Sequence, residues 1–272
     1  MTYDTLGLGA LDYLPCRYGT SKLTFRGPRR ALEAPYVAFL GGTATFGKFI
    51  EQPFPLLVEH LTGVTSVNFG QVNAGLDVFS KDSTVLEAAR GAQVTVIEAM
   101  GPVNMNNRFY SVHPRRNDRF LHASPDLKQL YYDVDFTQFS FTQHMLRHLY
   151  LCDAGRFAQI RHMLEKTWVR RMRRLLTQLS QEVVLVRIDA SGAEVGWSME
   201  AGPAPSLITD DMVDRLGPLL SAIVDVSSKK RSSGSEGMTF SILEEEAAKV
   251  VPHPHIHQEV ARALYPVLDR LM

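Results

Sequence analysis

A short apolar segment that ends in two glycines and a threonine is the first place in this chain where chemistry is expected. Residues 36–40 are apolar, Gly41 and Gly42 end the run, and the hydroxyl of Thr43 follows at once. Ligands of open α/β sheets bind at the carboxyl ends of strands, and hydrolases place nucleophilic hydroxyls on turns of this kind. The alternative interpretation is an ordinary glycine turn whose threonine caps the next helix.

Two later turns carry groups that can donate hydrogen bonds to an anion. Asn73 and Gly75 follow the segment 65–69, and Asn104 follows the segment 93–100. Glycine lets backbone N–H groups approach a ligand closely, and an oxyanion needs donors such as these or an asparagine amide. The alternative is ordinary turn chemistry, because asparagine tolerates left-handed backbone and bonds to its own backbone.

Three histidines at alternate positions precede the last helical segment, residues 258–272. His253 and His255 are placed to act as a base for Thr43, whereas His257 is expected in the first turn of the helix, packing or capping. Alternate residues of an extended segment share a face, which raises the possibility of a metal site. The intervening prolines disturb that regularity and no carboxylate cluster completes a ligand shell, so we predict no metal.

An arginine-rich stretch with interleaved aromatic residues predicts an anionic substrate. Its candidate binding residues are Arg108, His113, Arg115, Arg116 and Arg119. Guanidinium groups bind carboxylate or phosphate through two parallel hydrogen bonds and stack on aromatic rings. The alternative is a network that only holds this stretch down through its aspartates, which are Asp118, Asp126, Asp133 and Asp135.

The first glycine turn also fits a phosphate-binding pattern. Residues 42–48 match Gly-x-x-x-x-Gly-Lys, the core of a P-loop. Phe49 stands where a P-loop needs a serine or threonine for Mg²⁺, and Pro53 and Pro55 interrupt the helix that should follow. No Gly-x-Gly-x-x-Gly follows a strand either, so we predict no nucleotide or other cofactor.

Composition limits the classes of function. The 272 residues carry a formal net charge of +0, which argues against bulk nucleic-acid binding. The two cysteines, Cys16 and Cys152, lie far apart in the sequence, which fits a reducing compartment. The chain begins without a basic and then apolar leader, and no apolar run approaches the ~20 residues of a membrane span. We therefore expect a cytoplasmic protein that acts on a small molecule or a saccharide, without nucleic acid or membrane.

Apolar strand segments alternate with helical segments along the chain. The expected strands are residues 36–40, 65–69, 93–100, 182–188 and 222–226, and the expected helices are 55–61, 83–91, 155–179, 209–220 and 258–272. This alternation predicts a three-layer, flavodoxin-like α/β sandwich with a central parallel sheet of about five strands. Residues 1–35 are expected to wrap the domain formed by residues 36–272, and residues 101–154 to form an insertion in it.

The order of these motifs resembles the SGNH (GDSL-type) hydrolase superfamily, whose fold is similar to the predicted sandwich. The resemblance covers about residues 36–110 and 182–272, and the flanking stretches resemble those of a divergent, uncharacterised bacterial subgroup. It implies that Thr43 is the nucleophile and that His253 or His255 is the base. It also implies an oxyanion hole made of the backbone amides of Thr43 and of Asn73 or Gly75, together with the Asn104 side chain.

The departures from the superfamily pattern leave two functions open. Thr43 replaces the usual serine, Gly42 replaces the aspartate before it, and no aspartate lies three residues before any of the histidines. In triad enzymes, loss of the orienting aspartate costs on the order of 10⁴ in kcat. One hypothesis is an esterase, deacylase or acyltransferase acting on an anionic or saccharide substrate. The other is a catalytically inactive module that binds an anionic glycan or metabolite.

Overall fold

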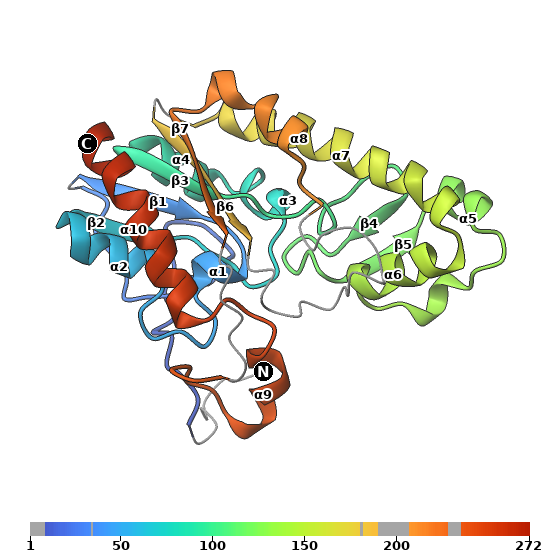
Figure 1. The fold of residues 1–272 in the computed structure, drawn as a ribbon, viewed down its shortest axis with the longest axis horizontal. Coiled ribbons are helices and arrows are strands. Elements are labelled where there is room, and N and C mark those ends of the chain that lie inside the picture. The colour runs from blue at the N-terminus through green and yellow to red at the C-terminus, as the bar shows by residue number, and fades with distance from the viewer. Residues whose placement is uncertain (1–8, 34, 180–181, 190–206, 228–234) are drawn as a thin grey trace.

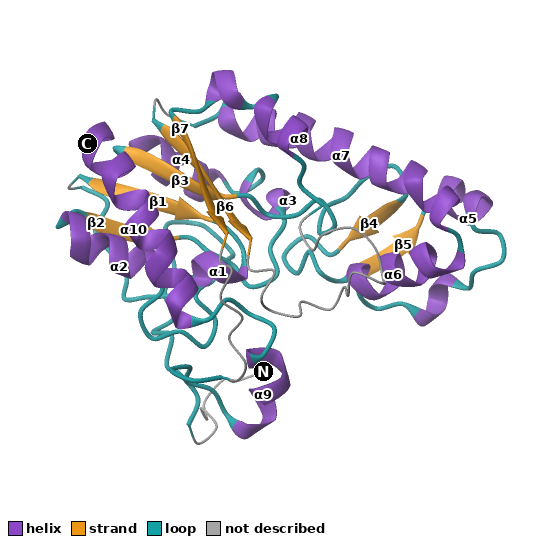
Figure 2. Ribbon diagram, viewed as in Figure 1, coloured by secondary structure: helices purple, strands orange, loops and turns teal. Residues whose placement is uncertain are grey.

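The protein is built on a central five-stranded parallel sheet with the strand order β2-β1-β3-β6-β7 (Figures 1 and 2). The computed structural model describes residues 9–33, 35–179, 182–189, 207–227 and 235–272. The strands are β1 (Tyr36–Leu40), β2 (Thr65–Asn68), β3 (Val94–Glu98), β6 (Val183–Asp189) and β7 (Ala222–Ser227). This is the flavodoxin-like order. From β1 the chain adds β2 on one side, and then β3, β6 and β7 on the other, so the topological switch point lies between β1 and β3. The predicted fold class, a three-layer α/β sandwich with five parallel strands, is confirmed.

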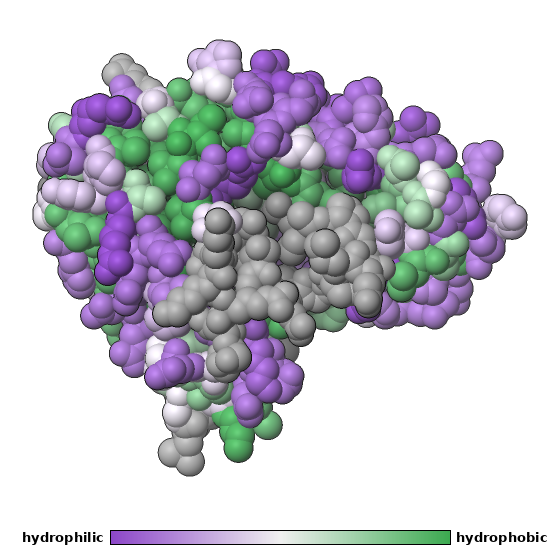
Figure 3. All heavy atoms as spheres, viewed as in Figure 1, coloured by the Kyte–Doolittle hydropathy of each residue, from purple (hydrophilic) through white to green (hydrophobic). Residues whose placement is uncertain are grey.

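The burial of the strands explains why their apolar sequences predict strands. Every residue of β1 is buried, because helices cover both faces of the sheet at this strand. β7 is an edge strand and alternates between exposed and buried residues, with Ile223 38% exposed. Figure 3 shows hydrophobic side chains gathered over this edge of the sheet.

One face of the sheet is covered by α2 (Phe54–Thr62) and α10 (Pro254–Leu271). Apolar residues of α10 recur at helical spacing and pack on the valines of β1, β3, β6 and β7. α10 begins four residues earlier than residue 258, the predicted start. The reason is local: His253 has an extended backbone at the N-cap position, and Pro254 occupies the first turn, where its missing N–H has no cost.

The opposite face is covered by α4 (Ser83–Gly91), by the second half of α7 (Ala154–Leu176) and by α8 (Asp210–Asp214). Trp168 of α7 is fully buried, and its indole N–H donates to the carbonyl of Met100 at 2.7 Å. The single helix predicted over residues 209–220 is instead α8 followed by the 3₁₀ turn η3 (Gly217–Leu219). Gly217 and Pro218 interrupt the helix there, since glycine is flexible and proline has no N–H to donate.

The segment 101–154 forms a lobe beside the sheet (Figure 1). It contains the antiparallel pair β4 (Tyr110–Val112) and β5 (Phe120–Ala123), then α5 (Pro125–Leu130), the 3₁₀ turn η1 (Phe136–Gln138) and α6 (Thr142–Cys152). These elements share a hydrophobic core with the first half of α7. The 23-residue helix α7 therefore connects the lobe to the sheet.

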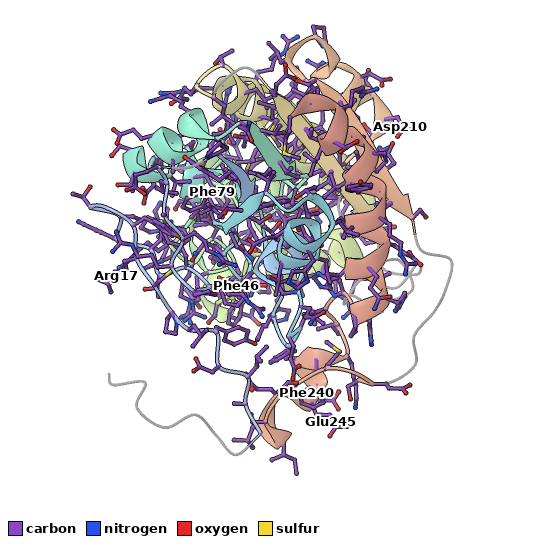
Figure 4. The ribbon with its side chains drawn as sticks, turned by 90° about the vertical axis from the view of Figure 1, so that its left-hand side faces the viewer. Arg17, Phe46, Phe79, Asp210, Phe240 and Glu245 are labelled. Carbon is purple, nitrogen blue, oxygen red and sulfur yellow. The ribbon has the colours of Figure 1, made fainter. Side chains whose placement is uncertain are left out.

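The chain before β1 packs against the residue that follows β2, and the chain before α10 packs against the segment that follows α1. Tyr18 and Phe25 are buried against Phe69, with ring centroids 5.3 and 5.2 Å from it. Before α10, η4 (Ile242–Glu244) and α9 (Glu245–Ala248) follow Phe240, whose ring lies 5.9 Å from that of Phe49. In the side view, Phe240 and Glu245 lie at the end of the molecule away from Phe79 (Figure 4).

A buried aspartate ties the lobe to α7 and to the short helix α3 (Leu76–Phe79). Asp77 is 3% exposed, forms an ion pair with Arg171, and accepts hydrogen bonds from the backbone and side-chain amides of Asn106 at 3.0 and 3.2 Å. Asn106 is thus engaged in structure.

Replacing Asp77 with alanine is expected to lower the free energy of unfolding by about 3 kcal/mol, because it leaves Arg171 and the Asn106 donors without their partner. Urea denaturation measures this loss. The matched control is Asp126→Ala, which breaks the more exposed pair with Arg108 and is expected to cost less than about 1 kcal/mol. Equal losses in the two variants would contradict a structural role for Asp77.

Candidate active site

A cleft of about 940 Å³ opens at the carboxyl ends of the parallel strands. One wall comes from the ends of β1, β3, β6 and β7, and the other comes from the lobe and from residues 250–252 before α10. Polar residues that line it include Thr43, Asn73, Glu98, Asn104, Arg147 and Arg187. This is the edge at which open α/β sheets bind ligands, so the turns singled out in the sequence do meet at one cavity.

Thr43 lies on the cleft wall as the first residue of the short helix α1 (Thr43–Phe46). Its hydroxyl accepts a hydrogen bond from the backbone N–H of Asn73 at 3.0 Å and donates to the side-chain oxygen of Asn73 at 3.2 Å. Asn73 has a left-handed backbone with φ +57°, a conformation that favours glycine and that asparagine tolerates.

Asn104 extends the same network. Its amide N–H donates to the backbone carbonyl of Asn73 at 3.1 Å, and its amide oxygen accepts from the hydroxyl of Thr142 at 2.8 Å. Gly75 lies beside Asn104, but its N–H donates to the side-chain oxygen of Asn117 at 3.1 Å. The structure therefore brings Thr43, Asn73 and Asn104 together, with the Gly75 N–H engaged elsewhere.

The histidines lie next to the cleft rather than in its lining. His253 is the buried N-cap residue of α10, directly after the lining residue Pro252, and its ring lies 6.2 Å from that of His255. Burial lowers the pKa of His253, which keeps its imidazole neutral. Within the part of the chain that the structure describes, the side-chain hydrogen bonds of Thr43 are both made with Asn73.

His257 has a structural role, as its expected place in the first turn of the last helix indicated. It is 1% exposed, its Nδ1 accepts the backbone N–H of Phe54 at 3.1 Å, and the two rings stack at 5.9 Å. Burial lowers the pKa of His257 to about 3, with the positive charge of Arg26 acting in the same direction.

The predicted anion-binding residues lie on the lobe, outside the described lining of the cleft. Arg108 forms an ion pair with Asp126 at 2.5 Å, and Arg119 stacks over the ring of Phe141 at 5.3 Å. The remaining three form a turn: the backbone N–H groups of Arg115 and Arg116 donate to Nδ1 of His113 at 3.3 and 3.1 Å.

Other basic residues, which no sequence motif predicted, also line the cleft. His144 and Arg147 lie on one side of α6, and Arg187 lies at the end of β6. Arg187 is paired with Asp225 and with Asp210, both at 2.5 Å, and these carboxylates raise its pKa. No motif marks His144 or Arg147, because only the packing of the lobe turns that face of α6 toward the sheet.

The P-loop alternative does not match the local geometry. α1 ends after four residues at Gly47, which has a left-handed backbone with φ +71°. The ammonium group of Lys48 lies over the ring of Phe49 at 4.5 Å. A P-loop needs a long helix that begins at its lysine, and here the chain turns away.

Glu98 is a further candidate site residue, which no sequence motif predicted. It is the last residue of β3, and its Oε2 accepts hydrogen bonds from Gly42 N at 2.8 Å, Thr45 N at 2.9 Å and Thr45 Oγ1 at 2.6 Å. Burial raises the pKa of Glu98, outweighing the opposite effect of these hydrogen bonds. A Cβ on Gly41 would lie 2.6 Å from Oε2, so the first glycine makes room for the carboxyl group. The available signal was an acidic residue at the carboxyl end of an otherwise apolar strand.

Two other kinds of feature are absent from the described residues. No group of three or more histidine, cysteine, aspartate or glutamate side chains in the described ranges is placed to hold a metal ion. Within those same ranges, no helix has the length and apolar character needed to cross a membrane.

Solved structures and a family model match this chain. A lipase from a goat rumen metagenome is 14% identical with a TM-score of 0.43, and the match covers 85% of this chain and 98% of that one. A gut microbial diltiazem-metabolizing enzyme is 12% identical with a TM-score of 0.41, covering 87% of this chain and 47% of the other. No curated protein matches the chain. A family model described as a domain of unknown function, DUF6473, matches residues 1–272, and the chain belongs to this family.

Proposed function

We propose that the protein is an SGNH-like acyl-transfer enzyme, an esterase, deacylase or acyltransferase, with Thr43 as its nucleophile. One observation carries the proposal: the Thr43 hydroxyl lies on the cleft wall and is bonded to the N–H of a left-handed Asn73, which is in turn bonded to Asn104. The order of these turns along the chain resembles the SGNH pattern and adds support.

In this proposal Thr43 attacks the acyl carbon and a histidine takes its proton. His253 and His255 are the candidates, since residues 250–252 line the cleft immediately before them. The Thr43 hydroxyl must then exchange its hydrogen bond to Asn73 Oδ1 for one to the imidazole. Catalytic hydrogen bonds are often long or misaligned before substrate binds, so a short movement at the start of α10 is part of the proposal.

The cleft also suggests a substrate class. A volume of about 940 Å³ suits a small molecule or a short saccharide, and Arg147 and His144 favour one that carries an anionic group. Both cysteines are free thiols, which favours a reducing, cytoplasmic compartment as the place of action.

The experiment that tests the proposal is labelling with a fluorophosphonate probe, mapped by mass spectrometry, together with a panel of short-chain p-nitrophenyl esters and O-acetylated oligosaccharides. The expected result is an adduct on Thr43 and turnover of at least one ester. A folded protein that takes up no probe and cleaves none of the esters would count against the enzyme.

A second function, a catalytically inactive module that binds an anionic glycan or metabolite, is favoured by a different observation. The Thr43 hydroxyl donates to an amide oxygen, and no histidine of the 253–257 segment is in the described lining of the cleft. A ligand at 100 times its Kd stabilises the fold by about 2.7 kcal/mol, so its binding is readable as a rise in melting temperature.

This function predicts that acidic oligosaccharides raise the melting temperature and that Arg147→Ala abolishes the rise. The control is the double variant Arg115→Ala, Arg116→Ala, whose side chains are outside the described lining and whose ligand response is expected to match the wild type. A rise that survives Arg147→Ala but disappears in the control would move the binding site to the surface of the lobe.

A further inference from the structure

The carboxyl group of Glu98 has two different oxygens. Among the described residues, all three hydrogen bonds to this side chain end on Oε2, and they come from the turn that carries Thr43. Oε1 lies on the side of Gly42, where an added Cβ would be 3.3 Å from it. Glu98, Gly42 and Thr43 all line the cleft, so the second oxygen lies beside the peptide that precedes the proposed nucleophile.

Burial raises the pKa of Glu98 toward the neutral acid, whereas the three donors to Oε2 act in the opposite direction. Among the described residues, no basic side chain forms an ion pair with it. Because Oε2 already accepts three donors, the proton of the acid belongs on Oε1. In its neutral form a carboxylic acid can donate a hydrogen bond to a developing negative charge.

Of the expected oxyanion donors, the Asn73, Gly75 and Asn104 groups are engaged elsewhere, and the Asn73 N–H is bonded to Thr43 Oγ1. The Gly75 N–H is bonded to Asn117, and the Asn104 amide N–H is bonded to the carbonyl of Asn73. An acyl-transfer site needs donors aimed at the place where the oxyanion forms. A further donor beside Thr43 would make up for those that the lobe and the second turn have taken.

We propose that Glu98, as a neutral carboxylic acid, is a catalytic residue that donates a hydrogen bond from Oε1 to the oxyanion formed when Thr43 attacks an ester. This inference rests on the proposed function. In the step, Thr43 Oγ1 forms a bond to the acyl carbon and its proton passes to the histidine base. The C=O electron pair moves onto the oxygen, which accepts the hydrogen bond from Glu98. The pair returns as the alkoxide leaves and takes the proton from the histidine.

The pH dependence follows from this role. Ionisation of Glu98 removes the donor and places a negative charge beside the oxyanion, so activity falls as the pH rises through its raised pKa. The other charged or titratable groups of the cleft are Arg187 on β6, Asp225 on β7, Asp210 on α8, and Asp118, His144 and Arg147 on the lobe. Arg187 is held by the two aspartates beside it.

The test compares Glu98→Gln and Glu98→Ala with the wild type, using p-nitrophenyl acetate hydrolysis from pH 4.5 to 9. Glutamine retains an acceptor for the turn and a donor for the oxyanion, so kcat is expected within about tenfold of wild type and without the fall at alkaline pH. Alanine removes the donor, so a loss of about 10²–10³ in kcat with little change in KM is expected. A fall at alkaline pH that Glu98→Gln shares with the wild type would overturn the inference.

A second measurement keeps the inference testable if Glu98→Ala fails to fold. The ¹³C resonance of the Glu98 carboxyl, assigned by its disappearance in Glu98→Gln, reports the protonation state of the full-length protein directly. Titration at or below the ordinary value of a glutamate would overturn the inference, whatever the kinetics.

The outcomes separate the two proposals. A wild type without turnover or probe adduct overturns the proposed function and the role of Glu98 with it. An active wild type whose pH profile is unchanged in Glu98→Gln overturns only the role of Glu98.

Discussion

Replacing Thr43 with alanine is expected to lower kcat/KM for ester hydrolysis by at least about a thousandfold and to abolish the fluorophosphonate adduct. The alanine side chain has no atom that can bond to the acyl carbon. The fold should survive, because the variant loses only the hydrogen bonds to Asn73, worth about 1 kcal/mol each, in a partly exposed position. Steady-state kinetics and a melting curve on the same sample measure both effects.

The matched control is Thr43→Ser. Serine keeps the hydroxyl and its hydrogen bonds with Asn73, and it lacks the methyl group that restricts χ1 and crowds the attack. We expect its kcat/KM to equal or exceed that of the wild type. If Thr43→Ala keeps its turnover while Thr43→Ser behaves like the wild type, the nucleophile is another residue.

The second large effect is a loss of stability in acid that originates at His257. Its folded-state pKa is about 3, below the ordinary value of 6.5, so the unfolded chain binds a proton that the folded chain does not. The resulting stability is fully present above pH 6.5 and is lost as the pH falls from there toward 3. The free energy of unfolding is expected to drop by roughly 3 kcal/mol between pH 7 and pH 4, as measured by urea denaturation.

His257→Asn separates this contribution from those of other groups. The asparagine oxygen can accept the N–H of Phe54 in place of Nδ1, and the side chain does not titrate. The variant should be less stable than the wild type at pH 7, since it packs less well on Phe54, and should show a flatter stability profile between pH 6.5 and 4. An equally steep profile would place the acid sensitivity elsewhere.

Much of the fold could be predicted from the sequence because its signals are local. Strands buried on both faces read as short apolar runs that end at glycine or asparagine, and their alternation with helices requires a parallel sheet. Thr43, Asn73 and Asn104 were predicted at one edge because each follows the carboxyl end of a strand. The ends of β2, β1 and β3 are neighbours in the sheet.

The positions of the histidines and the arginines were decided by the tertiary structure. Because α10 begins at Pro254, His257 lies in the same helical stripe as Val260, Ala261 and Leu264 and is buried against α2 with them. A helix predicted to begin at residue 258 does not include His257 in that stripe. Likewise, the lobe packs so that α6 presents Arg147 to the cleft, whereas Arg108 is paired with Asp126 on the lobe.

The sequence by itself thus predicted the parallel α/β sandwich, the sheet edge at which the candidate turns meet and the candidate nucleophile, because each follows from a local pattern and the chirality of parallel connections. Only the tertiary structure decided which side chains complete the site. Glu98 contacts residues more than fifty positions away in the chain, and the direction of its carboxyl group depends on the packing of β3 against the turn after β1. No local pattern encodes that packing, because it follows from the burial of the whole sheet.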